Sequence, residues 1–204
     1  KVAYNLQNKN IEFLKLVLNN KILKISEDFF KKGAFKKDRF NYQFDNITGR
    51  RLSGRCKDQL LHIDSRLCGV SPPITIHFLI YLTNVTKNSG ATQLIPKSHK
   101  IKRYPRKKDL KYAVKVPGKK GTMVIFNSSA WHGSSKKNHL DDRTILIISY
   151  NRWFLRQKFS SPYSLPKKYY VKLNKKEKMI FGFNNYPTKD EFGRLRMRGS
   201  LPKF

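Results

Sequence analysis

Acidic residues and cysteines are scarce in this 204-residue chain, and long apolar runs are absent. Only 13 Asp and Glu stand against 44 Lys and Arg, which gives a formal net charge of +31. The two cysteines, Cys56 and Cys68, are too few for a disulfide-dense scaffold and favour a reducing, cytoplasmic setting. The longest apolar runs, IHFLIYL and TILIISY, have the length of strands and fall short of the roughly 20 residues that span a bilayer. These absences argue against a disulfide-stapled protein and against a transmembrane helix.

The composition predicts one folded domain over residues 1–204. An apolar fraction of 39% with 13% aromatic residues is typical of a chain that buries a core. We expect a helical N-terminal part (1–57), because residues 8–32 carry apolar side chains at helical spacing. A β-rich core (58–153) should follow, and then a basic, aromatic-rich C-terminal segment (154–204) that wraps around it.

Short apolar stretches alternate with turn residues from residue 58 onward. Strands are predicted at 59–64, 74–83, 91–94, 113–116, 122–126 and 143–153. This pattern predicts a mainly β fold with flanking helices. Its core would be a double-stranded β-helix, the jelly-roll or cupin-like architecture.

The excess of positive charge admits two interpretations. A field of this sign favours anionic partners and raises their encounter rate. The lysines are nevertheless spread along the whole chain, which indicates a compositional bias. We favour a small, anionic substrate over nucleic acid, although basic and aromatic residues interleave in 155–204 in the way that single-stranded nucleic acid requires. No pattern specifies an oligomeric state.

A histidine and an aspartate stand two residues apart in LLHIDSRL, as His62 and Asp64. On a strand such residues share a face, because side chains alternate with a period of two. His132, in AWHGSSKKN, supplies a second imidazole. Two imidazoles and one carboxylate form the facial triad that binds non-haem Fe(II) and leaves positions open for reactants. We therefore interpret these three residues as the metal ligands and catalytic centre.

Arg143 and Ser134 follow His132 at short spacing. The planar guanidinium of an arginine matches a carboxylate in bidentate fashion, and a serine hydroxyl donates one more hydrogen bond. Alternation within TILIISY places Arg143 beside apolar neighbours, where a guanidinium needs an anionic partner. The pair therefore predicts a clamp for a carboxylate ligand.

These motifs resemble the phytanoyl-CoA dioxygenase family of Fe(II)/2-oxoglutarate oxygenases over about residues 58–153. The resemblance rests on the His-x-Asp pair, the segment NSGATQLIPKSHK and the spacing of His132, Ser134 and Arg143. In that family the middle segment reads approximately Asn-Gly, then apolar residues, then Pro-Gly-Ser-His. Here Lys97 replaces the glycine, which changes the shape of a loop and leaves the metal motif intact.

The resemblance implies a dioxygenase with Fe(II), 2-oxoglutarate and O2, in which Arg143 and Ser134 hold the distal carboxylate of 2-oxoglutarate. The reaction would release succinate and CO2 and hydroxylate a small, anionic substrate. Alternation along IHFLIYL puts His77 and Tyr81 on the face that would line the cosubstrate pocket. Candidate walls of the substrate pocket are Gln59, Arg66, Gln93, Trp131 and Arg152.

Other readings stay open. A zinc site from Cys56, His62 and Cys68 lacks the close paired spacing of structural zinc. The polar segment NHLDD (138–142) also carries metal-ligand types, but it has no strand alternation. At the level of function, the alternatives are a nucleic-acid-modifying oxygenase and a non-catalytic jelly-roll protein that binds polyanions.

Overall fold

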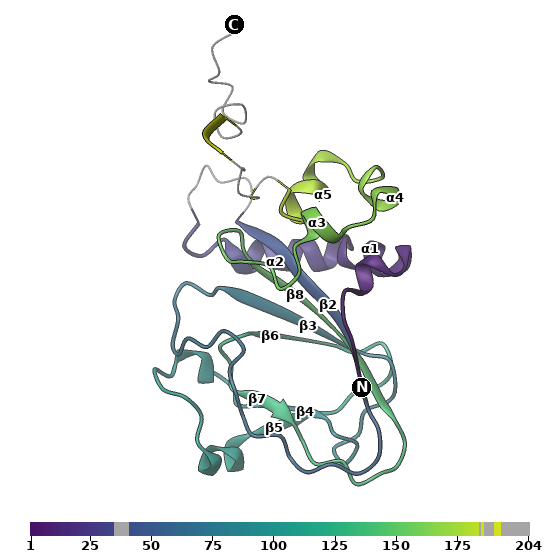
Figure 1. Cartoon of the computed structure of the whole chain (residues 1–204). Helices are drawn as coiled ribbons and strands as arrows, with labels where there is room; N and C mark the ends of the chain where they lie inside the picture. Colours follow the sequence, from purple (N-terminus) through teal and green to yellow (C-terminus); the bar gives the residue numbers. More distant parts are fainter. Residues whose placement is uncertain (35–40, 184, 186–189, 193–204) are drawn as a thin grey trace, which may run out of the picture.

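Two antiparallel sheets form the centre of the computed structural model, which describes residues 1–34, 41–183, 185 and 190–192 (Figure 1). The larger sheet has the order β1-β2-β8-β3-β6 and the smaller sheet has the order β5-β4-β7. The strands are β1 (Val2–Ala3), β2 (Tyr42–Leu52), β3 (Thr75–Tyr81), β4 (Thr92–Leu94), β5 (Val114–Val116), β6 (Met123–Asn127), β7 (His132–Ser134) and β8 (Arg143–Arg152). The helices are η1 (Leu6–Asn8), α1 (Ile11–Val17), α2 (Asn20–Phe30), η2 (Ser98–Lys100), η3 (Lys107–Tyr112), α3 (Ser161–Ser164), α4 (Lys167–Tyr170) and α5 (Lys175–Ile180).

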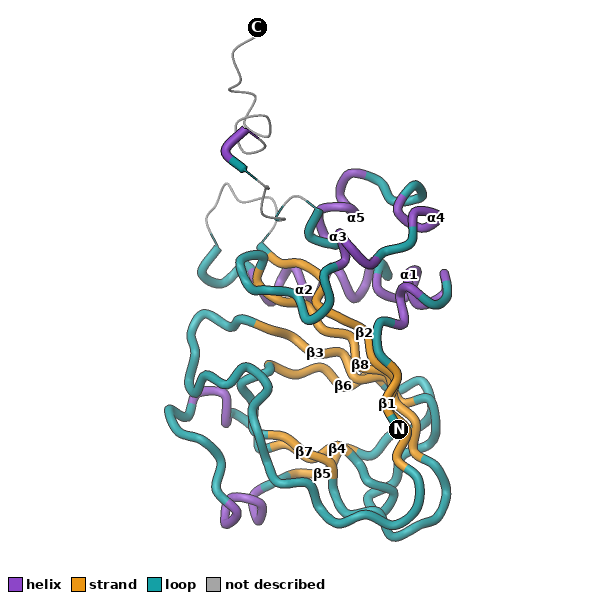
Figure 2. The backbone as a smooth tube through the Cα atoms, viewed as in Figure 1, coloured by secondary structure: helices purple, strands orange, loops and turns teal. Residues whose placement is uncertain are grey.

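The layers are arranged as helices, large sheet and small sheet (Figure 2). The helices α1 to α5 cover one face of the large sheet, and the small sheet lies opposite the other face. This arrangement confirms the predicted fold, a mainly β protein with flanking helices and a jelly-roll core. No helix among the described residues is long and apolar enough to cross a membrane.

Alternation along the central strands separates a structural face from a cavity face. On β8, Leu146, Ile148 and Tyr150 join the apolar core under the helices. Each fully buried aliphatic or aromatic side chain of this kind contributes about 1.5–3 kcal/mol. The intervening residues of β8 point the other way, toward the small sheet, and line the cavity described below.

The N-terminal part contains more than the predicted helices. Helices α1 and α2 occupy the predicted region 8–32, and the side chain of Asn19 caps the second helix by accepting hydrogen bonds from Lys21 and Ile22. Residues 1–57 are nevertheless not only helical, since β2 pairs along its whole length with β8. Conversely, the predicted strand 59–64 forms only an isolated bridge to β7.

The C-terminal helices pack on the same core. The apolar core under the helices contains the residues of β2 and β8 that face the helices. It also contains four buried side chains from the C-terminal part, namely Leu165, Tyr169, Leu173 and Phe181. Residues 184, 186–189 and 193–204 of the predicted wrap lie outside the described residues.

A buried lysine ties two loops at the edge of the small sheet. Lys137 is fully buried, and its Nζ donates to the carbonyl oxygens of Gly54, at 2.7 Å, and of His139. Its backbone also exchanges hydrogen bonds with Cys56. The side chain therefore has a structural explanation and is not available to a ligand.

Candidate functional site

His62, Asp64 and His132 converge at the open end of the jelly roll. The Nε2 atom of His62 lies 3.4 Å from one carboxylate oxygen of Asp64, and the Nε2 atom of His132 lies 3.6 Å from the other. One ligand atom from each residue lies within 4.8 Å of the others, which is the spacing that a single metal ion requires. No other group of three such residues is found in the part of the chain that the structure describes.

Backbone hydrogen bonds set this spacing. His62 and His132 face each other across an antiparallel bridge, with N–O distances of 2.9 and 3.1 Å. The amide of Asp64 donates to the carbonyl of Ser128 at 3.0 Å. Gly133 permits this close approach, because a Cβ atom there would lie 3.1 Å from the carbonyl oxygen of Gln59. The two segments are thus held together by main-chain atoms and not by the site's own side chains.

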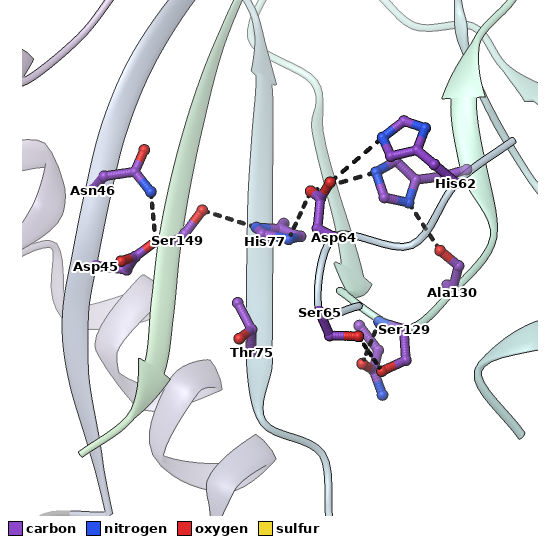
Figure 3. Close-up of polar contacts among 12 residues, drawn as sticks. Asp45, Asn46, His62, Asp64, Ser65, Thr75, His77, Ser129, Ala130 and Ser149 are labelled. Carbon is purple, nitrogen blue, oxygen red and sulfur yellow. Dashed lines mark hydrogen bonds and ion pairs between the residues drawn. The ribbon is translucent and has the colours of Figure 1, made fainter. Parts of the chain in front are cut away.

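Both imidazoles are oriented for coordination through Nε2, as Figure 3 shows for His62. The Nδ1 atom of His132 is 2.8 Å from the carbonyl oxygen of Ala130, and that of His62 is 3.3 Å from the carbonyl oxygen of Leu60. Such a second contact fixes the tautomer and the ring orientation of a metal-ligating histidine. The residues present therefore fit a divalent transition metal.

A third histidine, His77, contacts the carboxylate of Asp64 from the side opposite to His62 (Figure 3). The Nε2 atom of His77 lies 3.2 Å from Asp64, and its Nδ1 atom lies 2.8 Å from the hydroxyl of Ser149. Burial would raise the pKa of Asp64, but hydrogen bonds from His132, His62 and His77 outweigh it and hold the pKa well below its usual range. The hydrogen bond to Asp64 in turn raises the pKa of His62. The carboxylate is thus anionic and preoriented.

Arg143 brings an unpaired positive charge into the same cavity. Its guanidinium is buried, donates from Nη1 to the hydroxyl of Ser134 at 3.1 Å, and leaves Nε without a partner. Burial lowers the pKa of Arg143, and no carboxylate of the described residues acts on it. A buried charge without a counter-ion is unfavourable, so the arrangement fits an anionic ligand.

The cavity between the sheets has a volume of about 570 Å³ and changes character from end to end. The residues of β8 that face the cavity show this change from charged to apolar to polar. Arg143 lies at one end, Ile145 and Ile147 form an apolar middle, and Ser149 and Asn151 form a polar end. The triad opens onto this same cavity, so a cosubstrate, a metal and a substrate can share it.

Of the residues predicted to line the pockets, Gln59 faces the cavity, but Tyr81 and Gln93 do not. Gln59 does line the cavity, where its side chain accepts a hydrogen bond from the amide of Ser134 at 3.1 Å. Tyr81 is buried between the sheets and donates to the carbonyl of Val116 at 2.6 Å, outside the lining. Gln93 is also buried outside the lining, with its amide directed to Asp58.

The other three candidates likewise do not face the cavity. Arg66 is exposed at a loop position with a φ of 55°. Trp131 is buried beneath the guanidinium of Arg103, which lies 4.6 Å from the ring centroid. Arg152 points toward the helices, where the carbonyls of Pro73, Phe30 and Lys32 accept its hydrogen bonds. Its charge is satisfied by these carbonyls, although the sequence suggested a substrate contact.

Sequence reasoning missed the polar end of the cavity. Its lining includes Asp45, Asn46, Thr75, Ser128, Ser149 and Asn151. These residues come from strands that are distant in the sequence, and short polar side chains give no motif. The one available signal was the alternation that places Thr75 and Ser149 on the faces of His77 and Arg143.

A family comparison agrees with this geometry. The model of the phytanoyl-CoA dioxygenase family matches residues 1–144. The chain belongs to the phytanoyl-CoA dioxygenase family. The dioxygenase cdmD of Talaromyces verruculosus is 34% identical to this family member over 103 residues, and the match covers 46% of this chain and 34% of the relative. The chain thus spans about a third of the length of that curated relative.

Solved structures support the fold assignment of this phytanoyl-CoA dioxygenase family member. The non-haem α-ketoglutarate-dependent epimerase SnoN from nogalamycin biosynthesis matches with a TM-score of 0.60 at 13% identity, over 75% of this chain and 61% of SnoN. HygX from Streptomyces hygroscopicus, solved with nickel and 2-oxoglutarate bound, matches with a TM-score of 0.59 at 15% identity, over 76% and 71% of the two chains. At these identities the likeness shows a common fold.

Proposed function

We propose that this protein is an Fe(II)- and 2-oxoglutarate-dependent dioxygenase that hydroxylates a small organic substrate, with release of succinate and CO2. Membership of the family makes this class of chemistry the expected one. The observation that carries the proposal is the presence, in one cavity, of a facial-triad ligand set and of a buried arginine without a counter-ion. The first fits a metal and the second fits the anionic end of a cosubstrate.

The ligands in this proposal are the Nε2 atoms of His62 and His132 and the carboxylate of Asp64. Bound there, Fe(II) would supply oxygen activation coupled to the oxidative decarboxylation of 2-oxoglutarate. The remaining tasks belong to the chain. His77 contacts the Asp64 carboxylate and is itself held by Ser149, so it would orient the carboxylate for metal binding.

Arg143 and Ser134 would bind the distal carboxylate of 2-oxoglutarate. The guanidinium already donates to the hydroxyl, so the two groups of the clamp lie together. The hydroxyl donates its proton to the carbonyl of Gly90 at 3.1 Å and would turn away from it to bind the carboxylate. Leu79, Ile145 and Ile147 form apolar walls beside it. Such walls exclude water and strengthen the charge-assisted bonds to the cosubstrate.

The ligand set argues against halogenation, and hydroxylation is the outcome that we propose. Asp64 supplies the carboxylate in the position that halogenases of this superfamily leave open for a halide. Arg66 and Arg152 do not support the prediction of an anionic substrate, because both residues lie outside the cavity lining. The exposed cations Lys1, Arg50, Arg51, Arg156 and Lys158 do line it, and they support the prediction of an anionic substrate.

The proposal is tested by iron-dependent succinate release from 2-oxoglutarate, with and without a panel of small molecules and oligonucleotides. The wild-type chain should release succinate only with Fe(II), and His62→Ala and Asp64→Ala should abolish both release and metal binding. Glu12→Gln, on the exposed face of α1, is the matched control. A product heavier by one oxygen atom identifies hydroxylation.

Two results would contradict the proposal. A wild-type chain that binds Fe(II) and 2-oxoglutarate but releases no succinate, while it binds polyanions, would favour the non-catalytic alternative. Stimulation of succinate release by oligonucleotides alone would favour a nucleic-acid-modifying oxygenase.

A further inference from the structure

A strip of short polar side chains crosses the cavity wall next to the candidate metal centre. Antiparallel pairing places Asn46 of β2 opposite Ser149 of β8, and Asn151 of β8 opposite Thr75 of β3. The amide of Ser128, just after β6, donates to the carbonyl of Thr75 at 3.1 Å and so continues the strip. All five residues line the cavity. The strip therefore spans four neighbouring strands, at the level of the His77 side chain.

A β-bulge adds a carboxylate to one end of this polar strip. The pairing of β2 with β8 shifts between Phe44 and Asn46, so Asp45 is an additional residue on β2. Phe44 and Ile47 both point into the core under the helices. Asp45 and Asn46 between them both line the cavity (Figure 3). Bulges of this kind redirect side chains next to functional sites.

The carboxylate of Asp45 has acceptor capacity to spare. One oxygen accepts from the amide of Lys158 at 2.6 Å and the other from the side-chain amide of Asn46 at 2.6 Å. In the region that the structure describes, no Lys or Arg forms a salt bridge with it, although the chain has 44 of them. Burial raises the pKa of Asp45. A carboxylate accepts about four hydrogen bonds, so a donor from the cavity can still bind.

The opposite end of the polar strip has an unused hydrogen-bonding group. Ser128 lines the cavity, but its hydroxyl is fully buried, has no hydrogen-bond partner and can be reached from the cavity only when the side chain turns. A buried hydroxyl without a partner is unfavourable by roughly 1–3 kcal/mol, and a ligand hydroxyl or a bound water would relieve this. The two ends of the strip thus independently indicate a ligand that is rich in hydrogen-bonding groups.

We infer that the polar strip binds the substrate of the proposed dioxygenase, and that this substrate is a hydrophilic small molecule with a protonated amine that pairs with Asp45. Its hydroxyl groups would bind along Asn46, Thr75 and Ser128. An acyl chain would be rejected because it would offer no hydrogen bond to the carboxylate of Asp45 or to the unpartnered hydroxyl of Ser128, although Asn46 and Thr75 would keep their bonds to Asp45 and Asn151. The inference rests on the proposed function and adds the substrate class. The exposed Arg156 and Lys158 nearby allow the same ligand to carry an anionic group as well.

The test uses three probes of one carbon frame: serinol, glycerol and glycerate, which carry an amine, a hydroxyl and a carboxylate. The full chain is loaded with Zn(II), a redox-inactive substitute for iron, and with 2-oxoglutarate. Ligand-observed NMR then follows probe and cosubstrate in the same sample. The wild type should bind serinol about tenfold more tightly than glycerol, as expected for one charge-assisted hydrogen bond. Glycerate should bind less tightly than serinol.

Asp45→Asn should remove the preference for serinol while binding of 2-oxoglutarate persists. The asparagine can retain both local hydrogen bonds if the amide of Asn46 turns over, so the fold is preserved. Glu12→Gln removes one negative charge far from the cavity and should keep the preference. Equal binding of serinol and glycerol, no probe binding despite bound 2-oxoglutarate, or a preference for glycerate that is lost in Lys158→Ala would each overturn the inference. Loss of 2-oxoglutarate binding in the wild type would instead contradict the proposed function.

Discussion

Arg143 is the residue whose role can be measured most directly. Its buried guanidinium lacks an anionic partner, so truncation removes the charge that should hold the distal carboxylate of 2-oxoglutarate. A charge-assisted hydrogen bond contributes roughly 1.5–3 kcal/mol, which corresponds to about a ten- to hundredfold change. We therefore expect Arg143→Ala to raise the KM for 2-oxoglutarate by about this factor, measured through succinate release.

Arg55→Ala is the matched control, because Arg55 is exposed and lies outside the cavity lining. Its KM for 2-oxoglutarate should equal that of the wild type. An unchanged KM in Arg143→Ala would mean that the cosubstrate binds elsewhere.

At the residue scale, the sequence anticipated the groups that carry a chemical signature. The structure brings His62, Asp64 and His132 together as predicted, although His62 lies on an isolated bridge and not on a regular strand. The positions of Arg66 and Arg152 could not be predicted in this way, because the sequence around an arginine does not show whether it lies on the surface, under a helix or in a pocket. Arg152 shows the consequence, because backbone carbonyls satisfy it on the other side of the sheet.

At the scale of elements, the contact between β7 and the segment before Asp64 sets the spacing of the two histidines. Gly133 lies within this contact, and an added methyl group would meet the carbonyl oxygen of Gln59 at 3.1 Å. Gly133→Ala should push the two segments apart by a few tenths of an ångström. We expect the affinity for Fe(II) to fall about tenfold or more, as for other changes that disturb ligand orientation. Metal titration under anaerobic conditions measures it.

Gly49→Ala is the control for this prediction. An added methyl group there meets Leu6 at 3.4 Å, which is an ordinary contact distance. If both variants bind Fe(II) like the wild type, the segment can move without loss, and the proposed role of Gly133 is wrong.

The segment around η3 contacts Trp131, which precedes His132, and its contribution to the stability of the fold should depend on pH. Asp109 accepts hydrogen bonds from both terminal nitrogens of Arg103, at 2.8 and 2.9 Å, and Arg103 lies over the ring of Trp131, next to His132. The hydrogen bonds from Arg103, and then that from the amide of Arg106, hold the pKa of Asp109 well below its usual range. The interaction therefore stabilises the fold above the ordinary carboxyl pKa of about 4 and is lost as the pH falls below it.

Asp109→Asn should accordingly lower the Tm at neutral pH, and the difference from the wild type should shrink as the pH is lowered toward 3 and below. Thermal unfolding at a series of pH values measures this. A difference that is constant over the whole range would show that the carboxylate charge does not contribute.

Elements with regular periodicity were predictable, and the irregular ones were not. β3 and β8 are continuous apolar runs and were predicted nearly to their ends. β2 was missed because YQFDNITGRRL contains the bulge at Asp45, which breaks the alternation by which a strand is recognised. The same bulge forms part of the polar strip, so the missed strand and the missed site have one cause.

At the scale of the whole molecule, the net charge of +31 should limit stability at low ionic strength. Like charges repel one another in the compact state, and salt reduces the Debye length from about 30 Å at 0.01 M to about 10 Å at 0.1 M. We expect the Tm to rise over this range of sodium chloride concentration. Repetition with a neutral osmolyte separates screening from general stabilisation, and a falling Tm would show that repulsion between the cations does not limit stability.

Lys137 has a consequence for chemical labelling. The other lysines of the described residues are at least partly exposed, so a reagent in solution can acylate their amines, but the amine of Lys137 is fully buried and bonded to two carbonyls. A reagent reaches it only when the loops that carry Gly54 and His139 separate. The rate at which Lys137 is acylated therefore reports local opening at the edge of the small sheet, read by mass spectrometry against a background of fast surface sites.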